Sequence, residues 1–240
     1  MAETFVLLHG SWHGGWAWEP TAWCLRELGH EVHAPTYPGH LAGASRAGVR
    51  HDDYVSSVVR FIAGRDLRDV VLVGHSFGGS VVSRASQMIP ERLKRLVFHT
   101  ASVVEDGASV NDNFSADQTN AFAEAAAASP DNTVACPWDV FRDLFIQDAS
   151  PEAARSVWER LVLQPFSPWA KKLDLAQFHR GELPGASSGW PTTSRSGGWD
   201  GIRVCHRALG SSSWSRWAVA TKYVTRPGEL ADMLVEAASD

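Results

Sequence analysis

Residues 74–79, GHSFGG, directly follow the apolar run Val70-Val71-Leu72-Val73. A serine between two glycines after a buried strand is typical of a nucleophile elbow, a tight turn that leads into a helix. The small neighbours leave room for the strained turn, and a serine hydroxyl attacks a carbonyl once a base removes its proton. We therefore predict that Ser76 is a catalytic nucleophile. A glycine-rich turn without catalysis is the plain structural alternative.

Apolar runs and helical patterns alternate on both sides of this motif. We expect strands at residues 5–8, 31–34, 70–73 and 93–98, and helices at residues 20–28, 52–62, 80–88 and 227–238. Strands that alternate with helices form a mostly parallel sheet that is covered on both faces. The predicted fold class is therefore α/β.

The segment from residue 106 to residue 175 has a helical pattern that no clear strand interrupts. We interpret it as a helical cap, inserted into an α/β core made of residues 1–105 and 176–240. Ordinary helical packing on one face of the sheet is the alternative. The cap contains several aromatic residues, which suit either an apolar acyl or aryl pocket or the packing of the cap itself: Phe114, Trp138, Phe141 and Phe145.

The overall composition excludes several classes of protein. The chain has 240 residues, 44% of them hydrophobic, and a formal net charge of −5, which gives no reason to expect nucleic acid or a membrane as partner. No apolar run approaches the roughly 20 residues of a membrane span. The three cysteines are far apart, and the first residues lack the features of a signal peptide. We expect a cytoplasmic protein with a small-molecule partner and leave a homodimer open.

Residues 9–16, HGSWHGGW, follow the first predicted strand and form a glycine-rich loop. Such a loop can turn backbone donors toward the nucleophile, so we predict an oxyanion hole formed by the N–H groups of Phe77 and Ser11. The hydroxyl of Ser11 could also touch a substrate oxygen. We assign substrate contacts to Gly10, Trp12 and His99, the last at the end of a predicted strand. We interpret His9 as a structural hydrogen-bonding residue, and His75 should point away from Ser76 in the elbow, so neither is assigned as the base.

Three segments together resemble the α/β-hydrolase superfamily: the loop 9–16, the elbow 74–79, and the stretch Val97-Phe98-His99-Thr100-Ala101 followed by Glu105-Asp106-Gly107. Within it they resemble the small esterases related to plant methylesterases and hydroxynitrile lyases. The resemblance covers about residues 4–178 and resumes at residues 225–230. It implies an α/β-hydrolase fold with a helical cap, a Ser–His–Asp triad, hydrolysis of small esters, and no metal or cofactor.

The sequence departs from this pattern where the triad histidine and acid should lie. In such enzymes the histidine sits in a loop just before the last helix, but residues 218–223 here are AVATKY. The remaining candidates are His206 as base and Asp200 as acid. Nothing in their spacing shows that either reaches Ser76, so the alternative is that both are surface or core residues without a catalytic role. Glu105 and Asp106 are expected to begin the cap and not to serve as the acid.

These observations predict a serine hydrolase that cleaves small, largely apolar carboxylic esters or lactones through an acyl-enzyme. A lyase of the hydroxynitrile type would use the same serine without forming an acyl-enzyme. A third function, a catalytically impaired hydrolase fold that binds a small molecule, follows from the absent histidine.

Residues 180–224 form an anomalous stretch within the predicted core. Between residues 184 and 227 there are eight serines and four tryptophans, with Asp200 as the one acidic residue. If the last base of each codon is combined with the first two of the next, residues 218–223 permit Gly-Ser-His-Glu-Val. The same offset over residues 178–196 permits a strand-like run that contains Asp-Asp. We therefore hypothesise that this stretch is frameshifted; genuine divergence is the alternative.

Resequencing of the gene, together with mass spectrometry of the purified protein, tests the frameshift. We expect the restored frame, with peptides that carry a histidine shortly before residue 225. Peptides that match the printed sequence around Trp199 and Trp214 would refute a sequencing error.

Overall fold

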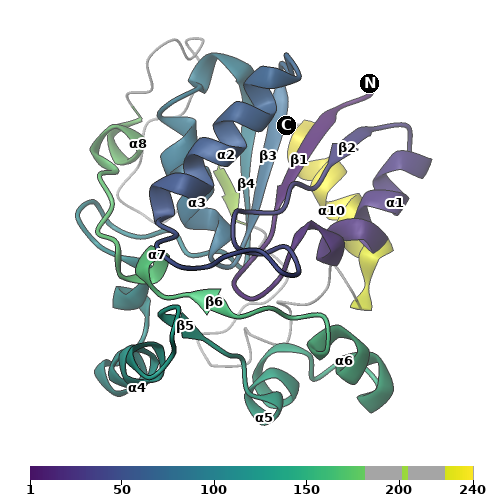
Figure 1. Cartoon of the computed structure of the whole chain (residues 1–240). Coiled ribbons are helices and arrows are strands. Elements are labelled where there is room, and N and C mark those ends of the chain that lie inside the picture. The colour runs from purple at the N-terminus through teal and green to yellow at the C-terminus, as the bar shows by residue number, and fades with distance from the viewer. Residues whose placement is uncertain (182–201, 205–224, 240) are drawn as a thin grey trace.

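The computed structural model describes residues 1–181, 202–204 and 225–239 (Figure 1). The strands are β1 Thr4–Leu8, β2 Glu31–His33, β3 Val70–His75, β4 Leu93–His99, β5 Thr133–Val134, β6 Gln164–Pro165 and β7 Ile202–Val204. The α-helices are α1 Glu19–Glu27, α2 His51–Gly64, α3 Gly78–Ser86, α4 Ala116–Ala127, α5 Trp138–Val140, α6 Pro151–Trp158, α7 Ser167–Ala170, α8 Ala176–Arg180 and α10 Pro227–Ser239. Shorter helical turns are η1 Gly15–Trp18, η2 Pro90–Arg92, η3 Val110–Asn113 and the π-helical η4 Phe141–Phe145.

The central sheet has five strands in the order β2-β1-β3-β4-β7, and every neighbouring pair is parallel. The strands expected from the apolar runs are present within two residues of their predicted ends. Helices follow β1, β2 and β3, as an α/β fold requires. The prediction of an α/β protein with a mostly parallel sheet is confirmed.

Both faces of the sheet are buried, which explains why its strands are continuous apolar runs. Along β3, Val70 and Leu72 belong to the core on one face, and Val71 and Val73 to the core on the other. Helices α2 and α3 cover the first face, and α1 and α10 the second (Figure 1). This alternation follows from the two-residue period of a strand.

A second layer lies beyond the carboxyl ends of the strands, where α4, α5, α6 and the short strands β5 and β6 gather (Figure 1). Strands β5 and β6 pair antiparallel. The expectation that no strand interrupts residues 106–175 is therefore wrong. Two-residue strands are too short for an alternating pattern, so the sequence carries no signal for them.

The segment that leads into this layer, residues 106–108, is hydrogen-bonded to the segment that leaves it, residues 173–175. Gly107 donates its backbone N–H to Leu173 at 2.8 Å, and Leu173 donates to Ala108 at 2.9 Å. The Asp106 carboxylate accepts the backbone N–H of Leu175 at 2.8 Å. The side chain of Asp106 therefore links the two segments that connect this layer to the sheet. The boundaries of the cap, 106 and 175, stay a prediction.

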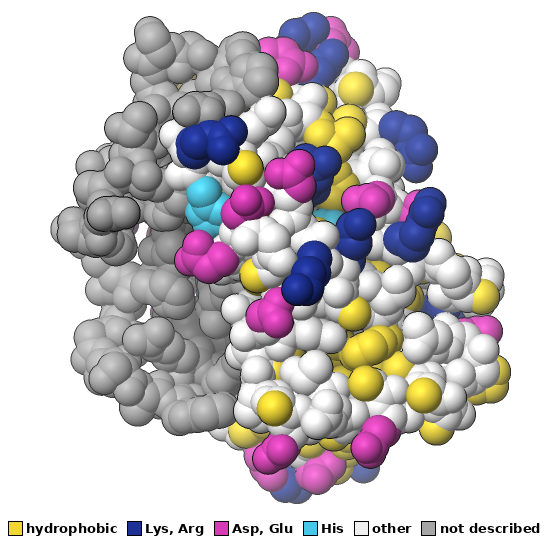
Figure 2. All heavy atoms as spheres, turned by 90° about the vertical axis from the view of Figure 1, so that its left-hand side faces the viewer, with side chains coloured by type: hydrophobic (Ala, Val, Ile, Leu, Met, Phe, Trp, Pro, Cys, Tyr) yellow, Lys and Arg dark blue, Asp and Glu magenta, His cyan; other side chains and the backbone are white. Residues whose placement is uncertain are grey.

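The surface in Figure 2 carries basic and acidic side chains intermixed around scattered hydrophobic atoms. Among the described residues, no helix combines the length and the apolar character that a membrane crossing needs. The absence of a nucleic-acid partner stays a prediction.

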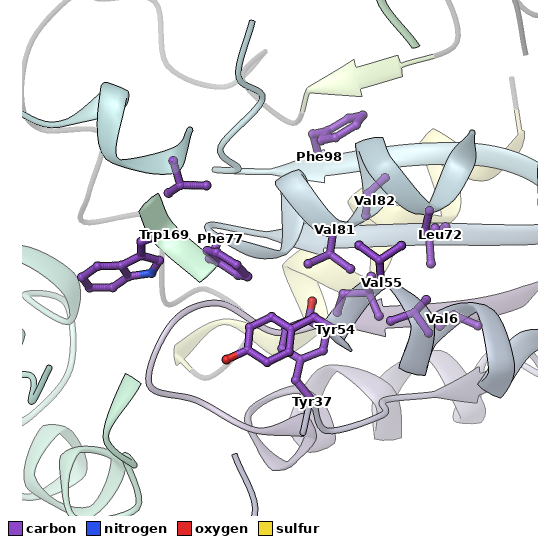
Figure 3. Packing of buried hydrophobic residues seen from close by; sticks show 14 of the residues in the cluster. Val6, Tyr37, Tyr54, Val55, Leu72, Phe77, Val81, Val82, Phe98 and Trp169 are labelled. Atoms are coloured by element: carbon purple, nitrogen blue, oxygen red, sulfur yellow. The ribbon is translucent and has the colours of Figure 1, made fainter. Parts of the chain in front are cut away.

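The core beside the elbow is dominated by stacked rings. Tyr37 stacks on Tyr54 with ring centroids 4.7 Å apart, and the edge of Phe77 meets Tyr54 at 5.7 Å. Figure 3 shows these three rings next to Val81 of α3 and Val55 of α2. The residue after Ser76 is thus anchored in the core by its side chain.

The glycines around Ser76 are required by backbone contacts. A Cβ built on Gly78 would lie 2.8 Å from the carbonyl oxygen of Leu8 and 2.9 Å from that of His9. A Cβ on Gly74 would lie 2.8 Å from the carbonyl carbon of Gly78. Because real Cβ contacts this short essentially never occur, a side chain here would push α3 away from β1 and β3.

Gly78→Ala is expected to destabilise the fold by about 1–3 kcal/mol, the usual cost of overpacking. Urea-induced unfolding measures the change. The matched control is Gly64→Ala at the end of α2, where a Cβ meets nothing within 4 Å. The control is expected to be neutral or to stabilise by up to about 1 kcal/mol, because alanine favours a helix. Equal effects of both substitutions would contradict this packing argument.

Candidate active site

Ser76 occupies the turn between β3 and α3 with φ of 50°, the left-handed region that a serine rarely adopts. Its carbonyl oxygen accepts the N–H of Gly79 at 3.0 Å and that of Ser102 at 2.8 Å. Its own N–H points to the carbonyl of His99 at 3.4 Å. These bonds hold the strained backbone, as the elbow geometry inferred from the sequence requires.

The first predicted oxyanion donor lies at the start of α3. Phe77 directly precedes Gly78, the first residue of that helix. Its backbone N–H donates no hydrogen bond to any residue that the structure describes. A free amide at a helix N-terminus favours a negative charge, because the helix dipole is positive at that end.

The second predicted donor belongs to the loop that follows β1. A Cβ built on Gly10 would lie 3.0 Å from Ser76 Cβ and 2.9 Å from His75 Nδ1, so the loop backbone touches the elbow. The next residue, Ser11, is buried, and within the described ranges its N–H likewise donates no hydrogen bond. Two uncommitted amides therefore belong to the segments that meet at Ser76.

Residues 11 and 12 of this loop are hydrogen-bonded to the second layer, which lies beyond the carboxyl ends of the strands. Trp12 donates its N–H to Gln164 Oε1 at 3.2 Å and its indole N–H to the carbonyl of Val134 at 2.9 Å. Its carbonyl accepts the N–H of Val162 at 2.8 Å. A further bond joins Trp169 Nε1 to Ser11 Oγ at 2.9 Å. Sequence reasoning missed Gln164 and Trp169, because more than 150 positions separate them from the loop.

Of the three residues predicted to contact substrate, Gly10 touches the elbow and the other two are buried. The Trp12 ring packs against Trp169, 5.2 Å between centroids, and Phe145. The His99 ring lies 6.3 Å from Trp18 and 5.4 Å from His75, on the α1 side of the sheet. Their contact with a substrate stays a prediction.

The cap aromatics singled out in the sequence make ring contacts within this layer. Phe114 packs on Phe122 at 5.4 Å, and Phe141 stacks on Phe145 at 6.2 Å. Trp138 meets Trp158 at 5.8 Å. These contacts favour packing of the cap as the role of the four residues over direct lining of a pocket.

Several histidines near the loop are buried. His9 Nε2 accepts the N–H of Tyr37 at 3.2 Å, so its proton is on Nδ1, which donates to the carbonyl of Gly10 at 2.8 Å. His40 Nδ1 donates to the carbonyl of His13 at 2.6 Å and its Nε2 faces Tyr54 Oη at 3.0 Å. Burial lowers the pKa of His9 well below 6.5. His9 is thus a structural hydrogen-bonding residue, as expected.

Burial also lowers the pKa of three further histidines. It lowers the pKa of His13, His40 and His51 to about 4 each. His51 Nε2 also meets Ser80 Oγ at 3.0 Å, behind the elbow. The bonds printed for these three rings go to the carbonyl of Ser11, the carbonyl of His13 and the hydroxyl of Ser80, and none goes to Ser76.

Within the described ranges, Ser76 Oγ forms no hydrogen bond with a histidine. His206 and Asp200, the sequence candidates for base and acid, lie outside the described residues. Strand β7 pairs with β4 and ends at Val204, two positions before His206. The roles of both residues stay predictions.

Comparison with known proteins identifies the fold. A model of the alpha/beta hydrolase family matches residues 5–234. A solved structure from a Paenibacillus species is 33% identical, with a TM-score of 0.81, and the match covers 99% of this chain and 100% of that one. It is described as an extracellular alpha/beta-hydrolase with structural and functional homology to tobacco salicylic acid binding protein 2. These matches confirm the predicted α/β-hydrolase fold.

Curated relatives include esterases. A carbendazim hydrolyzing esterase from Nocardioides sp. (strain SG-4G) is 40% identical over 111 residues, 44% of this chain and 45% of that protein. Putative methylesterase 15, chloroplastic, from Arabidopsis thaliana is 29% identical over 201 residues, 76% of this chain and 44% of that protein. The chain thus spans less than half the length of these relatives. The predicted resemblance to methylesterase-like proteins is confirmed.

The buried histidines predict a loss of stability in mild acid. Their folded pKa values lie below the unfolded value of about 6.5, so below that pH the unfolded chain binds more protons than the folded one. The free energy of unfolding should therefore fall as the pH drops from 7.5 to 5, by about 1–2 kcal/mol for each such histidine.

Urea unfolding at both pH values measures this dependence. His51→Asn removes one of the groups, so its stability should fall less over the same interval. A stability that does not change between pH 7.5 and 5 would show that these rings are accessible to protons in the folded protein.

Proposed function

Because the chain belongs to the alpha/beta hydrolase family, we propose that it is a carboxylic ester hydrolase with Ser76 as its nucleophile. One observation carries the proposal. Ser76 is held at positive φ, beside two segments whose amides at Phe77 and Ser11 bond to no described residue. A strained nucleophile with two free donors close by is the arrangement that acyl transfer needs.

The chemistry follows from this arrangement. Ser76 Oγ attacks the ester carbonyl, and its proton passes to the base, for which His206 with Asp200 is the sequence candidate. The carbonyl oxygen becomes negative, and the Phe77 and Ser11 N–H groups donate to it. The alcohol leaves with a proton, and water then hydrolyses the acyl-enzyme and restores Ser76.

We propose a small, largely apolar ester or lactone as the substrate. The esterase names of two relatives support the ester class. The apolar character of the acyl or aryl group stays a prediction from the sequence, since the cap aromatics pack on one another. A homodimer and a cytoplasmic location stay predictions, as does the absence of a metal or cofactor.

A second candidate function is a hydrolase fold that binds a small molecule without turnover. The observation that favours it lies in the sequence: residues 218–223, where the triad histidine of such enzymes is expected, are AVATKY. The lyase alternative would use the same serine, and trapping of an acyl-enzyme separates it from the esterase.

Labelling with a fluorophosphonate and hydrolysis of p-nitrophenyl acetate test the proposal. We expect Ser76 to be labelled, and Ser76→Ala to abolish labelling and to lower turnover by at least about a thousandfold. Ser57→Ala is the matched control, since the Ser57 hydroxyl donates to the Tyr54 carbonyl within α2. The control should behave as the original chain. Absence of both labelling and turnover would contradict the esterase, whereas labelled Ser76 would contradict the binder.

A further inference from the structure

The hydrogen bond from Trp169 to Ser11 joins the cap layer to the residue that is the predicted second oxyanion donor. The indole Nε1–H of Trp169, in α7, donates to Ser11 Oγ at 2.9 Å, and both residues are buried. An indole N–H can only donate, so the serine oxygen is the acceptor in this bond. The direction of the bond is therefore certain from chemistry alone.

This direction decides what the Ser11 hydroxyl can still do. A serine hydroxyl has one proton to donate and two lone pairs, and Trp169 uses one lone pair. Among the described residues, Ser11 Oγ donates to none. Ser11 is 8% exposed, so its hydroxyl proton is largely shielded from water. A buried donor without an acceptor is costly, and an acceptor supplied by a ligand would remove that cost.

The indole is held firmly enough to orient its partner. The Trp169 ring is 1% exposed and is surrounded by Trp12 at 5.2 Å, Phe122 at 5.0 Å and Phe114 at 6.1 Å. In Figure 3, Trp169 lies at the end of the core that contains Phe77. Because rings packed on several sides cannot rotate freely, the N–H keeps its direction.

The residue after Ser11 is also bonded to the cap layer, and the residue before it contacts the elbow. Trp12 is bonded to Gln164, Val134 and Val162, and Gly10 touches Ser76. The Ser11 hydroxyl thus sits between the elbow and the cap, one residue from the contact with the nucleophile.

We propose that Trp169 is a positioning residue that turns the Ser11 hydroxyl into a hydrogen-bond donor for an oxygen of the bound ester. The proposal rests on the proposed function for the chemical class of the ligand. Trp169 occupies the serine oxygen from the cap side, and the hydroxyl proton is thereby directed to the substrate. Specificity for oxygen-bearing substrates then comes from a side chain in addition to the two backbone amides.

Binding of phenyl acetate to the full chain carrying Ser76→Ala tests this without any turnover. In that background we measure the dissociation constant by NMR titration, alone and with Ser11→Ala, with Trp169→Phe, and with both. Ser11→Ala should weaken binding about threefold to tenfold, the range expected for one neutral hydrogen bond. Trp169→Phe keeps an aromatic side chain but loses the N–H, and should weaken binding by a similar factor.

The combination of the two substitutions gives the decisive result. If Trp169 acts through the Ser11 hydroxyl, Trp169→Phe has no further effect once Ser11→Ala is present. Equal effects of Trp169→Phe with and without the hydroxyl would overturn the proposal, as would an unchanged affinity in Ser11→Ala or a lack of binding in the Ser76→Ala background.

Trp158→Phe is the matched control, because Trp158 also donates its indole N–H within the cap, to the carbonyl of Cys136 at 2.9 Å. Its affinity for phenyl acetate should be unchanged. A loss equal to that of Trp169→Phe would assign the effect to general loosening of the cap and overturn the proposal. Hydrolysis by the chain with Ser76 intact is measured separately, so a failed esterase and a failed Ser11 contact give different results.

Discussion

The site depends on one close contact between backbones at the elbow. The first turn of α3 lies against the end of β1, so near that Gly78 has no room for a Cβ beside the carbonyls of Leu8 and His9. This contact lets Ser76 take a positive φ and leaves the amide of Phe77 at the start of a helix. Strain in the turn is thus balanced by packing of a helix on two strands.

The second constraint acts between the sheet and the cap. Gly10 contacts the elbow, whereas the next two residues, Ser11 and Trp12, are bonded to Trp169 and Gln164 in the second layer. The loop therefore contacts the sheet layer at the elbow and is hydrogen-bonded to the second layer. A shift of the cap would move the predicted oxyanion donor and the nucleophile relative to each other. The layer that contains Gln164 and Trp169 therefore takes part in setting this geometry.

Much of the fold was predictable from local patterns. The strands around β3 are continuous apolar runs, and the GHSFGG motif marks the turn between β3 and α3. The hairpin of β5 and β6 was missed, because two-residue strands show no period. The partners of the loop were missed for another reason: nothing near Trp169 in the sequence indicates that its indole meets Ser11, 158 positions away.

By itself, the sequence determined the α/β class, the position of the elbow and the need for glycine around Ser76, because these depend on periodicity and on the size of neighbouring residues. The tertiary structure decided which groups surround that serine. It brought Gly10 to the elbow, bonded Ser11 to Trp169 and left the amide of Phe77 uncommitted. Contacts between segments far apart in the chain depend on how whole layers pack, and no local pattern encodes that packing.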